Sequence, residues 1–517
     1  MLQLGGFVWS LRPHIRRYTA AARPTLVSSQ LRVDIHPVAP VVTRFAPSPT
    51  GLLHLGSLRT ALYNYLLAKN TGGKFILRLE DTDRKRYHAE AEQNILDTLD
   101  WCHIKWDGPM YRQSDRAREG LYTRYAEQLV KGGFAYKCFC SKERLNNLRE
   151  EGYDRHCTHL SDQEVNAFQG TPYVIRFKAP EVYDAVDDLL HGSVRIQPRR
   201  DRHGFDDPVL LKSDRFPTYH LANVVDDHLM GVTHVIRGEE WLPSTPKHIA
   251  MYKAFGWSAP QYVHIPLLTN VDDDKKLSKR RGDAAVYQLK QSGILPEALL
   301  NFVALLGWSP PRELANKTHE CFTLDQLVRL FNMNHLTRGN VKVDSKKLWF
   351  FNKHFLQERL KNDIELEPLV DRTNKAVADR FRSSDRTKVK RIIRECGTAL
   401  NSIDEFCDTF HYFFEKPVYT SETAGKFLAD NSNREVTTQL LHYLQEALRG
   451  NEMSLGEAVS DASQRFTVKK RTVFETLRFA LAGSLPGAKI PVLVSILGPN
   501  ETAARLQEAA AVVKNSY

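Results

Sequence analysis

The sequence lacks any uninterrupted apolar run of the roughly 20 residues that a membrane-spanning helix needs. This excludes a helical membrane protein and predicts no membrane partner. Cysteine is sparse, with 7 among 517 residues, which excludes the dense disulfide framework of a small secreted protein. With 42% hydrophobic and 26% charged residues, what is left is an ordinary globular chain, long enough for about two to four domains.

Acidic residues are nearly absent from residues 1–40, where one aspartate stands against five arginines, with serine and threonine between them. This composition is typical of a mitochondrial presequence. It predicts residues 1–40 as a transit peptide and the mitochondrial matrix as the location, with an extension that has no targeting role as the alternative. The formal charge of the whole chain is +11, which favours an anionic partner such as a nucleic acid.

The stretch 43–68, TRFAPSPTGLLHLGSLRTALYNYLLA, predicts a strand, a tight loop and a helix. A helix start offers unpaired backbone N–H groups and the positive end of a dipole, so this turn can hold a phosphate chain. His54 can donate to that phosphate, and Gly56 lets a base or ribose approach the backbone closely. A buried helix with a structural histidine is the alternative interpretation.

Acidic residues follow the next predicted strand, which runs from Phe75 to Leu79. Acids at the carboxyl end of a parallel strand lie where doubly wound folds bind ligands. A helix cap would explain Asp81 or Asp83 equally well, but it leaves Glu80 unexplained. Further along, the basic run KKLSKRRG at 275–282 indicates, taken alone, a solvated loop or an RNA contact.

Three of the seven cysteines lie in a segment, 116–220, that does not continue the alternation of strand and helix. Cys138 and Cys140 form a C-x-C pair, and Cys157 and His159 form a C-x-H pair. Three thiolates and one imidazole can complete a tetrahedral structural zinc site. The alternative is four unrelated residues or a degenerate site.

Taken together, these strings resemble the class I aminoacyl-tRNA synthetases, and among them the bacterial-type glutamyl-tRNA synthetases. HLGS at 54–57 resembles the HIGH signature, and KKLSK at 275–279 resembles the KMSKS loop. RLEDTDR at 78–84 and IRGEEW at 236–241 are similar to strings of the glutamyl group. The motifs stand in family order, and the resemblance extends over residues 41–510.

The resemblance implies an α/β fold with a split, doubly wound Rossmann-type catalytic domain. An α+β connective domain that grips the tRNA acceptor stem is inserted in it, and an all-α anticodon-binding domain follows. The expected ranges are 41–115 and 221–270 for the catalytic halves, 116–220 for the insertion, 271–353 for the KMSKS loop and stem-contact domain, and 354–517 for the anticodon domain.

The resemblance also implies which residues form the site for ATP, Mg²⁺ and L-glutamate. Catalytic roles fall on His54, Lys276 and Lys279. The ATP-binding residues would be Thr50, His54, Gly56, Glu240, Trp241, Leu277 and Lys279, and the glutamate-binding residues Arg44, Ser48, Glu80, Tyr219, Asn223 and Arg237. Arg44 and Arg237 are the candidates for the side-chain carboxylate, because a guanidinium forms paired charge-assisted bonds that the amide of glutamine cannot return.

The function so implied is ATP-dependent charging of mitochondrial tRNA(Glu) with glutamate, by a monomer. A non-discriminating enzyme that also charges tRNA(Gln) stays open, because Ala399 stands near the position where discriminating members of the family carry an arginine. Three rival interpretations are a tRNA-free glutamyl transferase of the queuosine type, a small adenylyltransferase and a catalytically inactive RNA-binding protein. The helical C-terminal part argues against the first, and the length of the chain and the pair of Arg44 and Arg237 argue against the second. Intact His54, Glu80 and Lys279 argue against the third.

Overall fold

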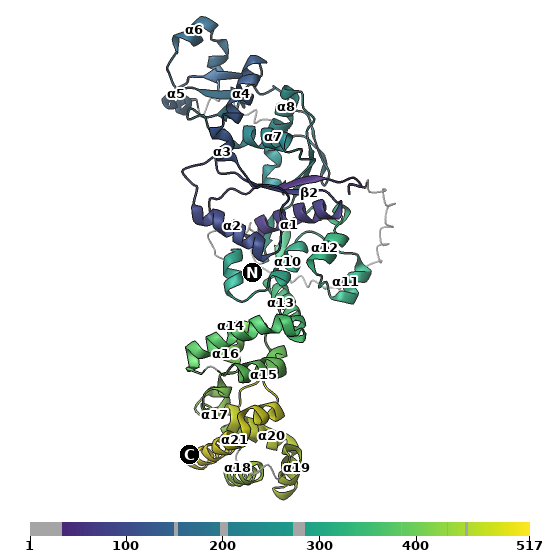
Figure 1. The fold of residues 1–517 in the computed structure, drawn as a ribbon, viewed down its shortest axis with the longest axis vertical. Helices are drawn as coiled ribbons and strands as arrows, with labels where there is room; N and C mark the ends of the chain where they lie inside the picture. The colour runs from purple at the N-terminus through teal and green to yellow at the C-terminus, as the bar shows by residue number, and fades with distance from the viewer. Residues whose placement is uncertain are drawn as a thin grey trace, which may run out of the picture.

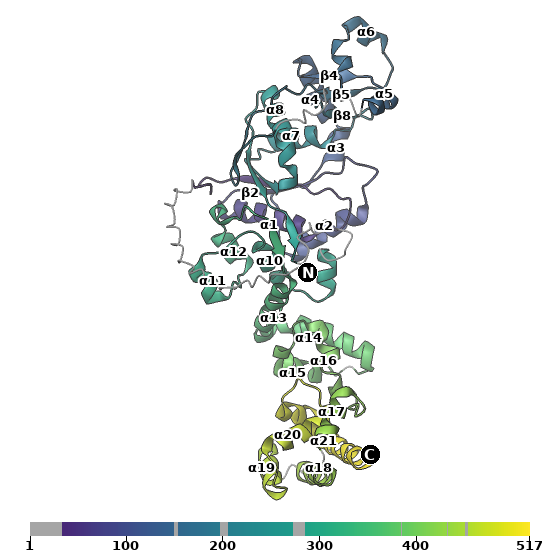
Figure 2. The ribbon, with the colours of Figure 1, turned by 180° about the vertical axis from the view of Figure 1, so that it is seen from behind.

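The computed structural model describes residues 34–148, 153–196, 205–271, 285–383, 385–431, 433–449 and 453–516. The molecule is elongated (Figure 1): helices of the insertion lie at one end, the main sheet lies in the middle, and the C-terminal helices form the other end. The view from behind shows the same order along the long axis (Figure 2). No helix of the described residues is long and apolar enough to cross a membrane.

The main sheet consists of two halves. In the first, β1 (Val42–Phe45), β2 (Lys74–Leu79) and β3 (Tyr111–Arg112) are parallel. In the second, β9 (His234–Gly238), β10 (Gln261–Ile265) and β6 (Val186–Asp188) are parallel, and β7 (Gly192–Val194) is an antiparallel edge strand. The halves meet where the Thr233 N–H donates to the Val42 carbonyl oxygen over 2.9 Å. The predicted split α/β sheet is therefore present.

Helix α1 (Leu55–Asn70) packs against β1, β2 and β9 and so covers the line where the halves meet. Its leucines at three- and four-residue spacing, from Leu55 to Leu66, are all buried, as the amphipathic pattern predicts. Three further helices complete the catalytic region: α2 (Ala89–Trp101), α7 (Tyr219–Leu229) and α8 (Thr245–Phe255), the last preceded by the 3₁₀ turn η2 (Glu239–Ser244).

The segment 116–220 contains a separate antiparallel sheet of β4 (Ala135–Cys138), β5 (Val174–Phe177) and β8 (Val209–Leu211). Its helices are α3 (Gln113–Arg118), α4 (Leu121–Lys131), α5 (Lys142–Asn147), η1 (His156–His159) and α6 (Asp162–Ala167). Strands β6 and β7 also fall in this range of the sequence, yet they extend the main sheet beside β10. The chain thus returns to the catalytic sheet once before the insertion ends.

A helical region follows the main sheet. It contains α9 (Val286–Gln291), α10 (Pro296–Ala304), α11 (Arg312–Thr318), α12 (Leu324–Leu330), η4 (Met333–His335) and α13 (Ser345–Lys361), with one parallel pair of short strands, β11 (Leu268–Asn270) and β12 (Val341–Val343). Residues 34–36, within the range predicted as presequence, pack here: the Ile35 N–H donates to Asn334 Oδ1 over 2.9 Å, and His36 Nε2 lies 2.8 Å from Asn70 Oδ1. Residues 1–33 lie outside the described residues.

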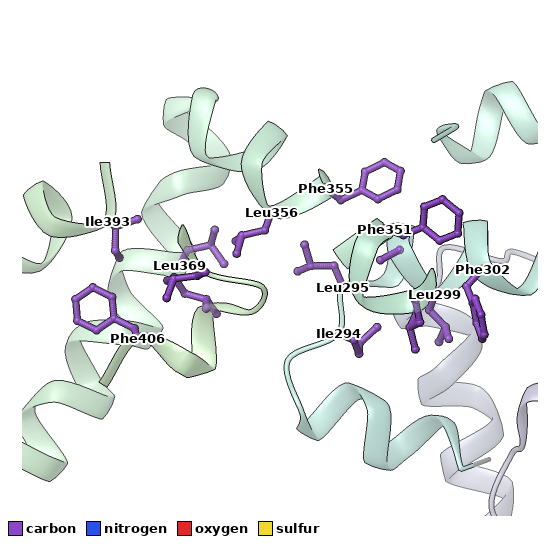
Figure 3. Packing of buried hydrophobic residues seen from close by; sticks show 14 of the residues in the cluster. Ile294, Leu295, Leu299, Phe302, Phe351, Phe355, Leu356, Leu369, Ile393 and Phe406 are labelled. Atoms are coloured by element: carbon purple, nitrogen blue, oxygen red, sulfur yellow. The ribbon is translucent and has the colours of Figure 1, made fainter. Parts of the chain in front are cut away.

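Beyond β12 the described residues contain helices and no strand, as predicted for the C-terminal part. These helices are α14 (Asp363–Phe381), α15 (Arg386–Cys396), η5 (Gly397–Ala399), η6 (Ile403–Glu405), α16 (Phe406–Thr409), η7 (His411–Phe413), α17 (Glu422–Asp430), α18 (Arg434–Arg449), α19 (Leu455–Arg465), α20 (Lys470–Ala482) and α21 (Ile490–Asn515). Their core is continuous with the catalytic core: Figure 3 shows Leu356 of α13 between Leu295, which precedes α10, and Leu369 of α14.

Candidate active site

A cavity of about 600 Å³ opens at the carboxyl ends of β1 and β9, above the start of α1. Ten of the residues predicted for the site line it: Arg44, Ser48, Thr50, His54, Gly56, Glu80, Tyr219, Arg237, Glu240 and Trp241. Asn223 does not line the cavity. Lys276, Leu277 and Lys279 lie outside the described residues. The fold therefore brings to one cavity residues that are almost 200 positions apart in the sequence.

The turn before α1 has a specific side-chain geometry. His54 is the N-cap of the helix: its Nδ1 accepts from the Ser57 N–H over 3.2 Å, and its Nε2 lies 3.0 Å from Ser57 Oγ. A Cβ atom on Gly56 would lie 3.2 Å from His54 Nδ1, closer than most such contacts. The glycine two positions after the histidine is thus what leaves room for the ring.

Arg44 is held by buried charges that the sequence analysis did not assign to the site. Its Nε donates to Asp227 Oδ1 over 3.1 Å, and Arg78 Nη1 donates to the same oxygen over 2.6 Å. Burial alone would raise the pKa of Asp227, but the two guanidinium groups hold that pKa below its usual range. Asn223 belongs to this network, since its Oδ1 accepts from both arginines over 3.3–3.4 Å. One sequence signal for this network was an arginine inside the otherwise apolar strand FILRL.

Glu80 lies at the end of β2, where its Oε1 accepts from Arg78 Nη2 over 3.4 Å. Burial raises the pKa of Glu80 to about 7, although Arg78 and Arg44 act in the opposite direction. Across the cavity, the rings of Tyr219 and Trp241 lie 4.1 Å apart between centroids. The cavity therefore combines a buried acid that titrates near neutral pH, two guanidinium groups and an aromatic wall.

The three predicted cysteine ligands converge in the insertion, but the predicted histidine does not join them. The Sγ atoms of Cys138, Cys140 and Cys157 all lie within 4.8 Å of one another. His159 is exposed and lies outside this group. The Tyr153 hydroxyl lies 3.3 Å from Cys138 Sγ. Three thiolates can supply three of the four ligands of a tetrahedral structural zinc site, so the thiols fit the ion, but the predicted fourth ligand, His159, is not part of the group.

Basic residues of α15 form ion pairs with acids of the neighbouring helix α14. Arg386 forms ion pairs with Asp371 over 2.7 Å and with Glu367, and Lys390 pairs with Glu367 as well. These charges are therefore already compensated by α14.

The sheet with its cavity at the switch between two halves, and the histidine–glycine turn at a helix start, define a class of α/β proteins that bind a nucleotide at this point. Comparison with known proteins identifies the family. Residues 40–350 match the family described as tRNA synthetases class I (E and Q), catalytic domain, and residues 365–510 match an anticodon binding domain. The chain belongs to this family of class I tRNA synthetases.

Individual relatives agree with this assignment over nearly the whole chain. A mitochondrial glutamate–tRNA ligase of Saccharomyces cerevisiae is 52% identical over 505 residues, covering 94% of this chain and 93% of the relative. The mitochondrial glutamate–tRNA ligase of Schizosaccharomyces pombe is 37% identical and covers 91% of each chain. The crystal structure of a glutamate–tRNA ligase from Elizabethkingia meningosepticum in complex with its amino acid superposes with a TM-score of 0.82 at 33% identity, covering 92% of this chain and 100% of that one.

Proposed function

We propose that this chain is a mitochondrial glutamate–tRNA ligase, which activates L-glutamate with ATP and transfers it to the 3′ end of tRNA(Glu). The observation that carries the proposal is the cavity at the split of the sheet, lined by Arg44, Arg237 and Glu80 beside the His54 turn. The names of the relatives support the same reaction and compartment. We infer the mitochondrial matrix as the location.

The glutamate subsite would use the charges that line the cavity. Arg44 and Arg237 would meet the carboxylates of the substrate, and Glu80 would accept from its ammonium group. Ser48 and Tyr219 would add hydrogen bonds that fix the pose. Asn223 would act from behind Arg44, because it contacts that guanidinium rather than the cavity.

The phosphate subsite would lie at the start of α1. The α-carboxylate of glutamate attacks the α-phosphorus of ATP and pyrophosphate leaves, so the protein supplies position and charge rather than a nucleophile. His54 would donate to the phosphates, and Gly56, Thr50, Glu240 and Trp241 would surround the nucleotide. The predicted roles of Lys276, Leu277 and Lys279 remain proposals on residues outside the described part. Mg²⁺ bound to the triphosphate would neutralise charge on the leaving group.

The remaining parts of the chain would bind tRNA, and the protein would act as a monomer. We assign acceptor-stem contact to the segment 116–220, stem contact to 271–353 and anticodon contact to 354–517. Ala399, which is exposed at the end of the turn η5, offers no guanidinium with which to reject the glutamine anticodon. A non-discriminating enzyme that also glutamylates tRNA(Gln) is the second candidate.

A structural zinc ion would be held by Cys138, Cys140 and Cys157. The three converging thiols support this site. Elemental analysis of the purified protein should give about one equivalent of zinc, and the triple Cys→Ser variant should give none. Less than a tenth of an equivalent in the wild type would reject the site.

Aminoacylation of purified mitochondrial tRNA(Glu) and tRNA(Gln) tests the function. We expect glutamate to be attached to tRNA(Glu) in an ATP-dependent reaction. Attachment of glutamate to tRNA(Gln) as well would favour the non-discriminating enzyme. Absence of charging on both tRNAs, with a folded protein, would reject the proposed function.

A further inference from the structure

Arg237 is surrounded by neutral hydrogen-bond acceptors, unlike Arg44. Its Nη1 donates to the Tyr219 hydroxyl over 3.1 Å, and its Nη2 donates to Thr245 Oγ1 over 2.7 Å. Its Nε donates to His264 Nε2 over 3.1 Å. Among the residues that the structure describes, no carboxylate forms an ion pair with this guanidinium, which is only 4% exposed. A buried positive charge without a counter-ion is costly, so this arrangement must be held in place by its neighbours.

The His264 ring faces Arg237 in one defined tautomer. Asp188 Oδ2 lies 2.7 Å from His264 Nδ1 and accepts from the His264 backbone N–H over 3.0 Å. Asp188 Oδ1 accepts from the backbone N–H groups of Leu190 and His191 over 2.8–2.9 Å. With backbone donors on both of its oxygens, Asp188 is a carboxylate, and His264 must carry its proton on Nδ1. The lone pair of Nε2 then faces Arg237.

The groups around His264 keep its ring neutral. Burial lowers the pKa of His264, while Asp188 on β6 acts in the opposite direction and Arg237 on β9 lowers the pKa further. His191 faces the backbone, its Nε2 lying 2.8 Å from the His264 carbonyl oxygen. From α8, His248 lies 3.3 Å from Arg237 Nη1, and burial together with Arg237 lowers its pKa as well. No second positive charge therefore opposes Arg237 from this side.

We propose that His264, oriented by Asp188, is a positioning residue for amino-acid selection: it holds Arg237 with its positive charge uncompensated, so that only an anionic substrate side chain completes the site. This inference rests on the proposed function. Neither His264 nor Asp188 lines the cavity, so both act through Arg237. Because the pair accepts from the guanidinium without neutralising it, discrimination against the neutral amide of glutamine depends on this pair.

The test compares His264→Leu with His264→Gln in the full-length protein. The leucine removes the acceptor for Arg237 Nε, whereas the glutamine side chain reaches the same place with a carbonyl oxygen. We expect His264→Leu to raise the KM for glutamate about tenfold to a hundredfold, with kcat and the KM for ATP within about twofold of the wild type. His264→Gln should recover most of that loss. The preference for glutamate over glutamine in kcat/KM should fall in His264→Leu by a similar factor.

Asp188→Asn provides a second, independent variant. Its amide N–H would face His264 Nδ1, so the ring proton would move to Nε2 and oppose the N–H of Arg237. We expect the same selective rise in the KM for glutamate. The matched control is His191→Gln, which changes a neighbour of His264 that does not contact Arg237 and should leave the KM for glutamate unchanged.

The proposed function and the positioning role of His264 would be rejected by different results. If the wild type does not charge tRNA(Glu), the proposed function falls. If the wild type charges it and a folded His264→Leu or Asp188→Asn keeps the wild-type KM and preference for glutamate, the positioning role is overturned. It is also overturned if kcat and the KM for ATP deteriorate as much as the KM for glutamate, because that pattern indicates general damage. Circular dichroism melting curves show which variants fold, and Asp188→Asn carries the comparison if His264→Leu does not fold.

Discussion

At the scale of single residues, the two arginines that line the cavity differ in their surroundings. Arg44 shares Asp227 with Arg78, whereas Arg237 contacts neutral acceptors. Replacing Arg44 takes one counter-ion from the buried Asp227 carboxylate. Replacing Arg237 removes a buried cation that has no carboxylate partner among the described residues. The two positions should therefore respond differently in stability, although we propose that both bind the same substrate.

We predict that Arg44→Met lowers the free energy of unfolding by about 2–4 kcal/mol, with Arg78 limiting the loss, and that Arg237→Met changes it by less than about 1 kcal/mol. Both should lower kcat/KM for glutamate at least about a hundredfold. Urea unfolding without ligand, together with glutamate-dependent charging, measures both effects. Equal losses of stability would contradict the assignment of charges.

The pKa of Glu80 predicts a pH dependence. In the folded protein this pKa is about 7, above the ordinary value of 4.5, so the folded state binds a proton that the unfolded state has released. Stability from this group is present below about pH 4.5 and is lost as the pH rises through 7, by on the order of 3 kcal/mol. Binding of a substrate ammonium group needs the ionised form, so kcat/KM for glutamate should rise with pH up to about 7.

The variant Glu80→Gln isolates this effect. It should show a nearly flat profile of kcat/KM for glutamate between pH 6 and 8, at a lower level than the wild type. Its free energy of unfolding should fall less than that of the wild type as the pH rises over the same range. A wild-type profile without a rise below about pH 7 would indicate that Glu80 is ionised throughout.

At the scale of elements, the start of α1 depends on a glycine at position 56, because a larger residue would crowd the His54 ring. Gly56→Ala would place a Cβ atom 3.2 Å from His54 Nδ1 and displace the ring from its N-cap position. We predict that the KM for ATP rises or kcat falls about tenfold or more, while stability changes by less than about 1 kcal/mol. Gly425→Ala in α17 is the matched control, because its Cβ atom meets nothing within 4 Å, and it should retain full activity.

Some elements followed from local patterns in the sequence, but the segments with which they pair and pack did not. The leucines of α1 and the apolar run of β2 predicted these two elements, because burial of their side chains leaves a regular pattern in the sequence. Strand β6 left no such trace: it is three residues long and joins the main sheet from within the insertion. Its Asp188 reaches His264 only because β6 pairs with β10, a contact between positions 76 residues apart.

At the scale of the whole molecule, one buried side chain joins the catalytic region to the C-terminal helices. Asn352 of α13 accepts from the Leu295 N–H over 2.7 Å and donates to the carbonyl oxygens of Gly293 and Asn401 over 3.2 and 2.8 Å. Because Gly293 precedes α10 and Asn401 precedes α16, the side chain links backbone segments of both regions. The apolar core continues through the same joint (Figure 3).

We predict that Asn352→Ala lowers the free energy of unfolding by about 2–4 kcal/mol, because it leaves the buried Leu295 N–H without its acceptor and removes a donor from the carbonyl oxygens of Gly293 and Asn401. All seven tryptophans lie before residue 350, so their fluorescence reports the catalytic side, while circular dichroism reports the C-terminal helices as well. The two unfolding transitions should coincide in the wild type and separate in the variant. Asn431→Ala, which removes a bond within the end of α17, should cost less than about 1 kcal/mol and leave the transitions together.

The sequence by itself determined what local chemistry specifies: the strand, turn and helix around His54, the acid after β2, the helical C-terminal part and the residue types of the site. Only the tertiary structure decided which charges compensate one another. It placed Asp227 against Arg44, gave Arg237 no carboxylate partner among the residues that the structure describes, and left His159 outside the group of thiols. The physical reason is that ion pairs and ligand sets form between side chains that are distant in sequence, whereas periodicity and turn chemistry act between neighbours.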